Sequence, residues 1–288
     1  MRCDICPRRC GVERSQRVGF CGMGEDLRVA KVQKHFWEEP FISGSQGSGT
    51  IFFSGCNLKC VFCQNYSVSR GYGKDIDAHR LADIFAELEE SGVHNINLVT
   101  GTHFVRQIVD ALNIYRPKIP IVYNCGGYES EETLCMLDGL VDIYLPDFKY
   151  SDNALAIKYS QAPDYFEVAS KAIDIMQRQV GKSVIEDGIM RKGICVRHLV
   201  LPNNLPNTYG VLEWLKDNLD DSHYISLMGQ YYPCGESKKF EELSRKLKPI
   251  EYKLAISKAE KLGLSNVLIQ DLSSADAEYT PDFDLQGV

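Results

Sequence analysis

The chain of 288 residues is long enough to bury a core and to form one large domain or two small ones. Its 44% hydrophobic and 25% charged residues are ordinary for a globular protein, and a net charge of -7 offers no basic field to nucleic acid or to an anionic membrane. No apolar run approaches the roughly 20 residues of a membrane helix, and the start, "MRCDICPRRC", lacks the apolar stretch of a signal peptide. We therefore expect a cytoplasmic protein without a membrane partner, and we do not expect nucleic acid as a ligand.

The first 48 residues form a Cys-rich extension that lies outside the pattern of the rest. Its cysteines follow the spacing C-x2-C-x3-C-x10-C: Cys3, Cys6, Cys10 and Cys21. Four thiols within about twenty residues of a cytosolic chain favour a second metal site with four protein ligands. Zinc and an iron–sulfur cluster both remain open, and a disulfide hairpin is disfavoured in a reducing compartment. We expect residues 1–48 to pack on the edge of the main domain, with Arg8 and Arg9 on a solvated edge.

From residue 49 onward, short apolar runs alternate with helical patterns. The expected strands are residues 49–55, 95–101, 119–124, 141–149, 193–202, 223–231 and 266–271. The expected helices are residues 77–92, 103–115, 130–140, 163–180, 208–219 and a stretch around 236–262. In the first helix Asp77 is a plausible cap, Gly92 a stop, and four apolar side chains share one face: Leu81, Ile84, Phe85 and Leu88.

Strands that are apolar throughout, each followed by a helix, are typical of a parallel sheet covered by helices. Six or seven such units fit a partial (β/α)6-type barrel over residues 49–275 better than a doubly wound sheet, with residues 276–288 as a C-terminal tail. In either architecture ligands gather at the carboxyl ends of the strands. The loop that follows residue 55 therefore lies at the mouth of the site.

That loop reads "FFSGCNLKCVFCQNY" and places Cys56, Cys60 and Cys63 in the spacing C-x3-C-x2-C. A structural zinc site uses four closed ligands, and no fourth ligand lies near in the sequence. A cubane iron–sulfur cluster ordinarily takes four cysteines, so three leave one iron open for a substrate. The alternative is a structural cluster or zinc completed by a distant Cys or His.

The segment "CNLKCVFC" resembles the cysteine signature of the radical S-adenosylmethionine (SAM) superfamily. The order of strands resembles the branch that includes pyruvate formate-lyase activating enzymes. Several phrases resemble a PflX-type group, whose members are commonly labelled activating enzymes without a known substrate: "WEEPFISG", "NINLVTGTHFV", "VDIYLPDFKY", "APDYFEVA", "VRHLVLP" and "YTPDFDLQGV". The likeness covers nearly the whole chain.

This resemblance implies a [4Fe-4S] cluster held by Cys56, Cys60 and Cys63, whose fourth iron chelates the methionine part of SAM. One electron from a low-potential donor of the flavodoxin or ferredoxin type then cleaves SAM. The 5′-deoxyadenosyl radical that forms abstracts hydrogen from a substrate, for which a protein is one candidate. The protein itself supplies orientation and a dry cavity.

The resemblance also indicates where SAM binds. The second strand usually ends in a GGE-type motif for the methionine amino group, and here it reads "VTGTHF", without the glutamate. In this stretch Gly101 allows close backbone approach and Thr102 is expected to cap the next helix. Of the adjacent pair Arg197 and His198, only one can face inward. The full set expected at SAM or its cavity is Phe62, Thr100, Gly101, Thr102, His103, Asn124, Asp147, Lys149, Met228 and Gln230.

The remaining cysteines and histidines are read as structural. Small buried apolar side chains are expected at Cys125, Cys135, Cys195 and Cys234. Ordinary surface residues are expected at His35, His79, His94 and His223.

Three functions compete. The first is hydrogen abstraction from another protein, as glycyl-radical activating enzymes perform it. The second is radical SAM modification of a peptide, an RNA or a small metabolite. The third, a non-enzymatic metal-binding or zinc nucleic-acid module, is disfavoured by the acidic pI and by a loop of three rather than four cysteines.

Overall fold

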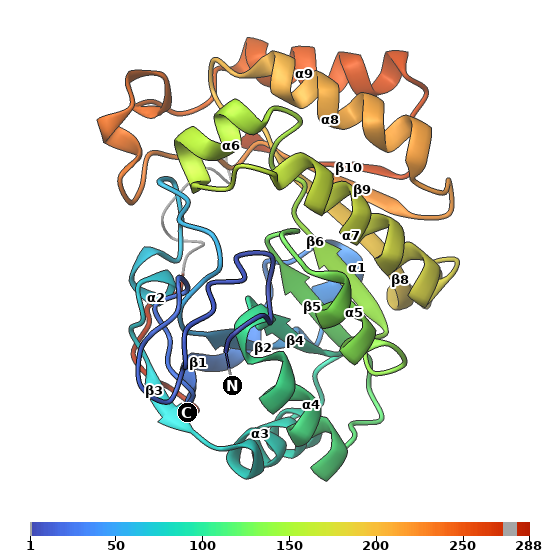
Figure 1. The fold of residues 1–288 in the computed structure, drawn as a ribbon. Helices are drawn as coiled ribbons and strands as arrows, with labels where there is room; N and C mark the ends of the chain where they lie inside the picture. Colours follow the sequence, from blue (N-terminus) through green and yellow to red (C-terminus); the bar gives the residue numbers. More distant parts are fainter. Residues whose placement is uncertain (1, 273–280) are drawn as a thin grey trace.

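A computed structural model describes residues 2–272 and 281–288 of the chain (Figure 1). Its strands are β1 (Leu27–His35), β2 (Ser48–Phe53), β3 (Lys74–Ile76), β4 (Ile96–Val99), β5 (Ile121–Cys125), β6 (Ile143–Pro146), β7 (Val184–Glu186), β8 (Ile189–Leu199), β9 (Tyr224–Met228) and β10 (Val267–Ile269). Its α-helices are α1 (Pro40–Ser43), α2 (Tyr66–Ser69), α3 (Ala78–Glu90), α4 (Val105–Ile114), α5 (Glu131–Leu137), α6 (Asn153–Ser160), α7 (Tyr165–Val180), α8 (Leu205–Asn218) and α9 (Pro249–Lys261). Short 3-10 turns are η1 (Thr102–Phe104), η2 (Ser237–Lys239) and η3 (Glu241–Leu243).

The described strands form one twisted, largely parallel sheet, which confirms the predicted α/β fold. Its order is β10-β9-β8-β6-β5-β4-β2-β1-β3, and all neighbours from β10 to β2 are parallel. In Figure 1 helices α8 and α9 cover the β9–β10 end of the sheet, and α3 and α4 lie at the opposite end. Each of the seven strands expected from the sequence occurs.

The strands and helices form where apolar side chains can be buried. Every residue of β2, β4, β5 and β6 is buried, as a sheet covered on both faces requires. Helix α3 buries the predicted apolar stripe, and the carboxylate of Asp77 accepts a hydrogen bond from the Arg80 N–H at 2.8 Å. Gly92 follows the helix with φ of +80°, a conformation that favours glycine.

Two helical segments differ from expectation. The stretch 236–248 contains only the turns η2 and η3, and α9 begins at Pro249, whose fixed φ suits a first helical position. Helix α6 was not expected, because it has only eight residues and buries only Ala156, Tyr159 and Ser160. The Asp152 carboxylate caps this helix by accepting from the Ala154 N–H at 2.7 Å.

Segments near both ends of the chain contact the edge of the sheet. β1 pairs antiparallel with β2 and with β3. Its hydrogen bonds therefore join the expected N-terminal extension, residues 1–48, to the sheet of the main domain. The C-terminal residues 281–288 lie along β1, where the Val32 N–H donates to the Gln286 carbonyl at 2.9 Å. Residues 276–280 of the predicted tail lie outside the described residues. The division into segments stays a prediction.

Across residues 2–272 and 281–288, no helix has both the length and the apolar character that a membrane crossing demands.

Candidate active site

A cavity of about 420 Å³ lies at the carboxyl ends of the parallel strands. All three cysteines of the loop after β2 line it: Cys56, Cys60 and Cys63. Polar side chains from the ends of β5, β6 and β8 face the same space: Asn124, Asp147, Lys149 and Arg197. Apolar groups complete the wall: Leu58, Phe62, Val99, Leu199 and Met228. The parallel sheet has thus brought distant sequence segments to one site.

Hydrogen-bond donors point at the sulfurs of this loop. The Leu58 N–H donates to the Sγ of Cys56 at 3.3 Å, and the Ser160 hydroxyl donates to the Sγ of Cys60 at 3.0 Å. Such donors stabilise thiolates, which are the form that binds iron. The surroundings of the loop therefore suit a ligand set of three thiolates.

Burial makes these thiols hard to ionise without a cation. It raises the pKa of Cys56 to about 12 and that of Cys63 to about 11. The Ser69 hydroxyl and the ammonium of Lys149 act in the opposite direction on Cys63. A metal centre compensates the charge of the buried thiolates, and its binding releases their protons.

Two other thiols lie near the loop but have partners of their own. Cys234 donates to the carbonyl oxygen of Phe62 at 3.3 Å and does not line the cavity. Cys125 lines the cavity, and its thiol is hydrogen-bonded to the carboxyl group of Glu129. Neither thiol is directed at the loop as a fourth ligand.

The loop fits an iron–sulfur cluster better than a single ion. Throughout the described ranges, no three His, Cys, Asp or Glu side chains converge on one point as ligands of a single metal ion. In a cubane cluster each cysteine binds a different iron, so the three sulfurs need to face one cavity and not one atom. Cys56, Cys60 and Cys63 meet that condition.

Beside the cysteines, buried charges form a paired group. Asp147 accepts from the Lys149 ammonium at 2.5 Å and from the Arg197 guanidinium at 3.0 Å. Burial alone raises the pKa of Asp147, but the two cations outweigh burial and hold that pKa below its usual value. The site therefore keeps a carboxylate and two cations charged inside the protein.

Glu38 is a site residue that the sequence interpretation missed. One of its carboxylate oxygens accepts from the Arg197 guanidinium at 3.2 Å, and the other accepts from the amides of Asn97 and Asn124 at 3.0 and 3.1 Å. It comes from the chain after β1, which precedes the alternating strands and helices in the sequence. The acidic pair in "WEEP" was the only sequence signal.

The residues expected at SAM divide into two groups. Those that line the cavity are Phe62, Thr100, Asn124, Asp147, Lys149, Met228 and Gln230. Those that lie outside its lining are Gly101, Thr102 and His103. The role of both groups in SAM binding stays a prediction.

The stretch after β4 differs in detail from what was expected. Thr102 does not cap α4, because it lies in η1 and its hydroxyl donates to the Glu129 carboxyl at 2.7 Å. His103 is buried, with Nε2 2.7 Å from the Ser54 carbonyl oxygen. Gly101 packs closely, since a Cβ there would lie 2.6 Å from Ile108.

The strand alternation expected at β8 is confirmed. Arg197 faces the cavity, whereas His198 is fully buried on the other side of the strand. There its ring nitrogens lie 2.7 Å from the Phe148 carbonyl oxygen and 3.0 Å from the Thr208 hydroxyl. Burial lowers the pKa of His198 to about 4, so its ring is neutral.

Three expectations about single side chains are wrong. Cys135 is exposed rather than buried, because it lies on the outer face of α5. His223 is buried rather than on the surface, with Nδ1 2.8 Å from the Ser183 hydroxyl. His35 lines the cavity, because β1 ends at its mouth.

Comparison with known proteins places this site in a family. A family model described as the radical SAM superfamily matches residues 50–190, which include the three-cysteine loop. The chain belongs to the radical SAM superfamily. It is also 33% identical, over 272 residues, to the uncharacterized protein MJ0674 of Methanocaldococcus jannaschii, an alignment that covers 91% of this chain and 75% of that protein.

Several solved structures share the fold. SuiB of Streptococcus suis bound to its precursor peptide SuiA has a TM-score of 0.51 at 13% identity, over 76% of this chain and 48% of SuiB. Methylornithine synthase (PylB) has a TM-score of 0.50 at 16% identity, over 83% and 74% of the two chains. The enzyme anSMEcpe with bound AdoMet has a TM-score of 0.50 at 17% identity, over 75% and 61%. The chain thus spans about half of SuiB.

Membership of this superfamily implies a [4Fe-4S] cluster and SAM as cofactors. The cysteines that fit the cluster are those of the loop after β2, because all three line one cavity and hydrogen-bond donors face the sulfurs of Cys56 and Cys60.

Proposed function

We propose that this radical SAM enzyme abstracts hydrogen from a polypeptide substrate, with a glycyl-radical enzyme as the first candidate. The observation that carries the radical SAM part is one cavity faced by Cys56, Cys60 and Cys63 and by a paired charge group. The resemblance to activating enzymes supports the substrate class.

The protein's own residues divide the work. The three cysteines would hold the cluster, which, with SAM and one electron from a flavodoxin- or ferredoxin-type donor, supplies a radical able to abstract hydrogen. Lys149 lies close enough to Cys60 to interact electrostatically with it, and its ammonium would bind a carboxylate next to the cluster. Apolar side chains such as Phe62 and Leu199 exclude water from the reacting atoms.

The mouth of the cavity supports a large substrate. Trp37 lines the cavity and is 63% exposed, so an aromatic surface lies at the entrance. Exposed aromatic side chains at an entrance are typical of surfaces that bind other proteins. Modification of a short peptide is the second candidate, because SuiB, which shares the fold, was solved with its precursor peptide.

The chemistry is tested by reconstituting the full chain anaerobically and adding dithionite and SAM. We expect wild-type protein to contain the cluster and to release 5′-deoxyadenosine. Cys60→Ala should lose both, whereas Cys135→Ala, on the exposed face of α5, should keep both. A wild-type protein that holds a verified cluster and releases no 5′-deoxyadenosine would contradict the proposal.

The substrate class is tested by deuterium transfer. A glycyl-radical enzyme and a set of short peptides, each deuterated at the α-carbon of glycine, are offered separately to the reconstituted enzyme. Deuterium in 5′-deoxyadenosine from the folded protein alone supports activation, and deuterium from peptides alone supports the second candidate. Deuterium from neither substrate, with 5′-deoxyadenosine still released, overturns the polypeptide assignment but not the radical chemistry.

A further inference from the structure

We propose that the four N-terminal cysteines form a second metal centre, a tetrathiolate site that fixes the loop of the first. This inference goes beyond the proposed function. The sulfurs of Cys10 and Cys21 each lie 3.4 Å from the place that a Cβ of Gly19 would occupy. Cys3 is hydrogen-bonded to Cys10 through its side chain, and Cys6 lies within electrostatic reach of Cys3 and Cys21. All four are free thiols, so the disulfide alternative is not what the structure contains.

Backbone turns bring N–H groups to these sulfurs. The N–H of Arg8 donates to the sulfur of Cys6, and the N–H groups of Val12 and Phe20 donate to that of Cys10. N–H groups directed at sulfur stabilise a thiolate and are a regular feature of metal-thiolate sites. The surroundings therefore favour the charged form that a metal binds.

The segment has little secondary structure and little apolar core of its own. Between residues 2 and 26 the structure has no helix and no named strand, only an isolated bridge from Arg2 to Glu13. Its buried apolar side chains up to residue 24 are few: Ile5, Cys6, Cys21 and Met23. Segments with so small a core usually depend on a disulfide or a structural metal. With the cysteines unpaired, a metal would add a constraint to the contacts that the segment makes with the main domain.

The segment is joined directly to the three-cysteine loop. The carbonyl oxygen of Cys21 accepts from the N–H of Cys56 at 3.2 Å. A Cβ on Gly55 would lie 2.8 Å from the same oxygen, so the N-terminal segment and the three-cysteine loop are in close contact. The position of one ligand of the first centre is therefore set by the backbone of a ligand of the second.

Arg8 makes the second connection. It is not on a solvated edge, because its guanidinium stacks 4.0 Å from the Phe20 ring. Its Nε donates to the Asn57 carbonyl at 2.7 Å and its Nη2 to the Ser160 carbonyl at 3.2 Å. The hydroxyl of that serine in turn donates to Cys60, so the segment supports a second ligand of the loop.

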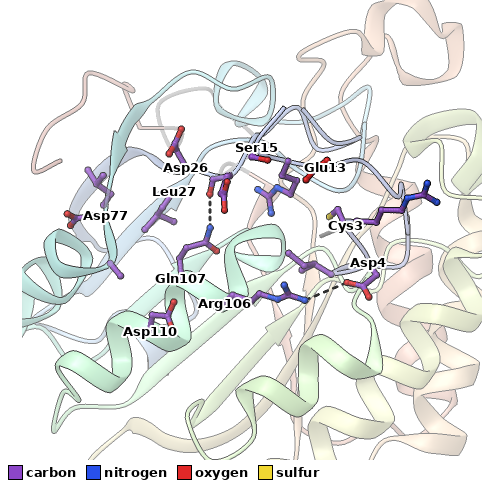
Figure 2. Close-up of a pocket in the computed structure, with 16 residues that line it drawn as sticks. Cys3, Asp4, Glu13, Ser15, Asp26, Leu27, Asp77, Arg106, Gln107 and Asp110 are labelled. Carbon is purple, nitrogen blue, oxygen red and sulfur yellow. Dashed lines mark hydrogen bonds and ion pairs between the residues drawn. The ribbon is translucent and has the colours of Figure 1, made fainter. Parts of the chain in front are cut away.

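A route from solvent leads to the proposed centre. Cys3 lines a hollow of about 460 Å³ between the N-terminal segment and the start of α3 and α4 (Figure 2). The Arg106–Asp4 ion pair, at 3.6 Å, lies in the same hollow. A metal site requires such an entry path. Among the described residues no three of these sulfurs converge on one point. An iron–sulfur cluster, which takes one sulfur on each iron, needs no such convergence, whereas a zinc ion would have to draw the four sulfurs together.

The decisive experiment removes the first centre and counts the metal that remains. The full chain carrying Cys56→Ala, Cys60→Ala and Cys63→Ala is purified anaerobically, with folding checked by circular dichroism. We expect about one zinc, or about four irons, per chain after reconstitution. Cobalt substitution identifies a zinc site by its thiolate charge-transfer band, and Mössbauer spectra identify a cluster. A folded variant that binds neither metal overturns the proposal.

A second variant covers the case in which the triple variant does not fold. Cys6→Ser with Cys21→Ser keeps the Cys21 carbonyl contact but removes two proposed ligands. Compared with wild type, it should lose the second metal, keep about four irons and change the electron paramagnetic resonance spectrum of the reduced cluster. The matched control, Cys135→Ser with Cys195→Ser, should change none of these. Loss of all iron in the first pair, or no loss of metal, would contradict two separate centres.

These outcomes are independent of the radical chemistry. The metal count of the triple variant requires neither SAM cleavage nor a substrate, so the proposed function can fail while the second centre stands, and the reverse.

Discussion

Glu129 is a carboxyl group buried behind the wall of the cavity. It accepts from the Thr102 hydroxyl at 2.7 Å and from the Tyr123 hydroxyl at 3.2 Å, and it is 3% exposed. Burial raises its pKa to about 8, although both hydroxyls act in the opposite direction. The folded protein therefore holds a proton on this carboxyl where the unfolded chain has released it.

This proton makes stability depend on pH. The folded pKa of Glu129 lies above the unfolded value of 4.5, so its stabilisation is fully present below pH 4.5 and is lost as pH rises through about 8. We expect Glu129→Gln to match wild type near pH 4 and to become progressively more stable than wild type as pH rises from 4.5 to about 8. The gain above pH 8 is on the order of 5 kcal/mol, for a shift from 4.5 to about 8 at about 1.4 kcal/mol per pKa unit. Urea unfolding at a series of pH values measures it.

Glu131→Gln is the matched control for this prediction. Glu131 is exposed at the start of α5, where a hydrogen bond from Lys171 lowers its pKa. Its substitution should change stability little, and with the opposite dependence on pH. A difference between Glu129→Gln and wild type that stays constant from pH 5 to 9 would show that the Glu129 carboxyl is already ionised in the folded state.

Single residues were predictable where the cysteine motif, the family resemblance or a strand end pointed to them. The three loop cysteines follow from their spacing, Asp147 and Lys149 from the family resemblance of "LPDFK", and the structure places all five at one cavity. Glu38 was not predictable, because β1 delivers it from outside the strand–helix alternation. Thr102 was read as a helix cap, but the buried carboxyl of Glu129 is a partner that sequence distance concealed.

At the scale of elements, the turn after β5 is held by contacts to its neighbours. Gly127 has a φ of +76°, and a Cβ there would lie 2.1 Å from the Asp147 carbonyl oxygen. The Tyr165 hydroxyl, from α7, lies 2.9 Å from the Gly126 carbonyl oxygen and 2.8 Å from that of Asp147. It also accepts from the Lys149 N–H at 2.9 Å. One helix thereby ties together the ends of two strands that line the cavity.

Gly127→Ala should therefore be strongly destabilising. The left-handed backbone costs about 1–2 kcal/mol for alanine, and the clash with Asp147 adds about 1–3 kcal/mol. Gly139→Ala is the control, because Gly139 has a similar φ of +71° but nothing within 4 Å of its Cβ position. We expect a loss of roughly 3 kcal/mol or more at Gly127 and about 1 kcal/mol at Gly139 in urea unfolding. Equal losses would show that the close contact relaxes without strain.

Elements were predictable in proportion to the length of their pattern. The apolar runs of β2, β4 and β5 are buried on both faces and were predicted, as was α3, whose stripe spans about two turns. Helix α6 was missed, and the stretch 236–248 was wrongly expected to be helical. Their local pattern is short, and packing against the rest of the chain decides their conformation.

At the scale of the whole molecule, the two ends of the chain meet on the sheet. Residues 281–288 lie along β1, and the Phe283 ring packs edge-on at 5.4 Å against Phe52, which lines the cavity. Lys31 is 5% exposed, and its ammonium lies 3.0 Å from the Asp284 carboxylate. Long-range pairing of this kind leaves no periodic signal in the sequence. The parallel core was therefore predictable, and the way its edge is covered was not.

Deletion of residues 281–288 should loosen that edge and leave the rest of the sheet intact. The loss of the Phe283 contact and of the Lys31 partner should lower the free energy of unfolding by about 1–3 kcal/mol. Hydrogen exchange gives the sharper measurement, because the Val32 N–H loses its acceptor, the Gln286 carbonyl, and should exchange faster. The Ile96 N–H, bonded to the Pro120 carbonyl at 3.0 Å, is the internal control and should stay protected. Unchanged exchange at Val32 would show that the tail does not cover β1 in solution, and equal acceleration at both amides would show that the tail stabilises the whole sheet.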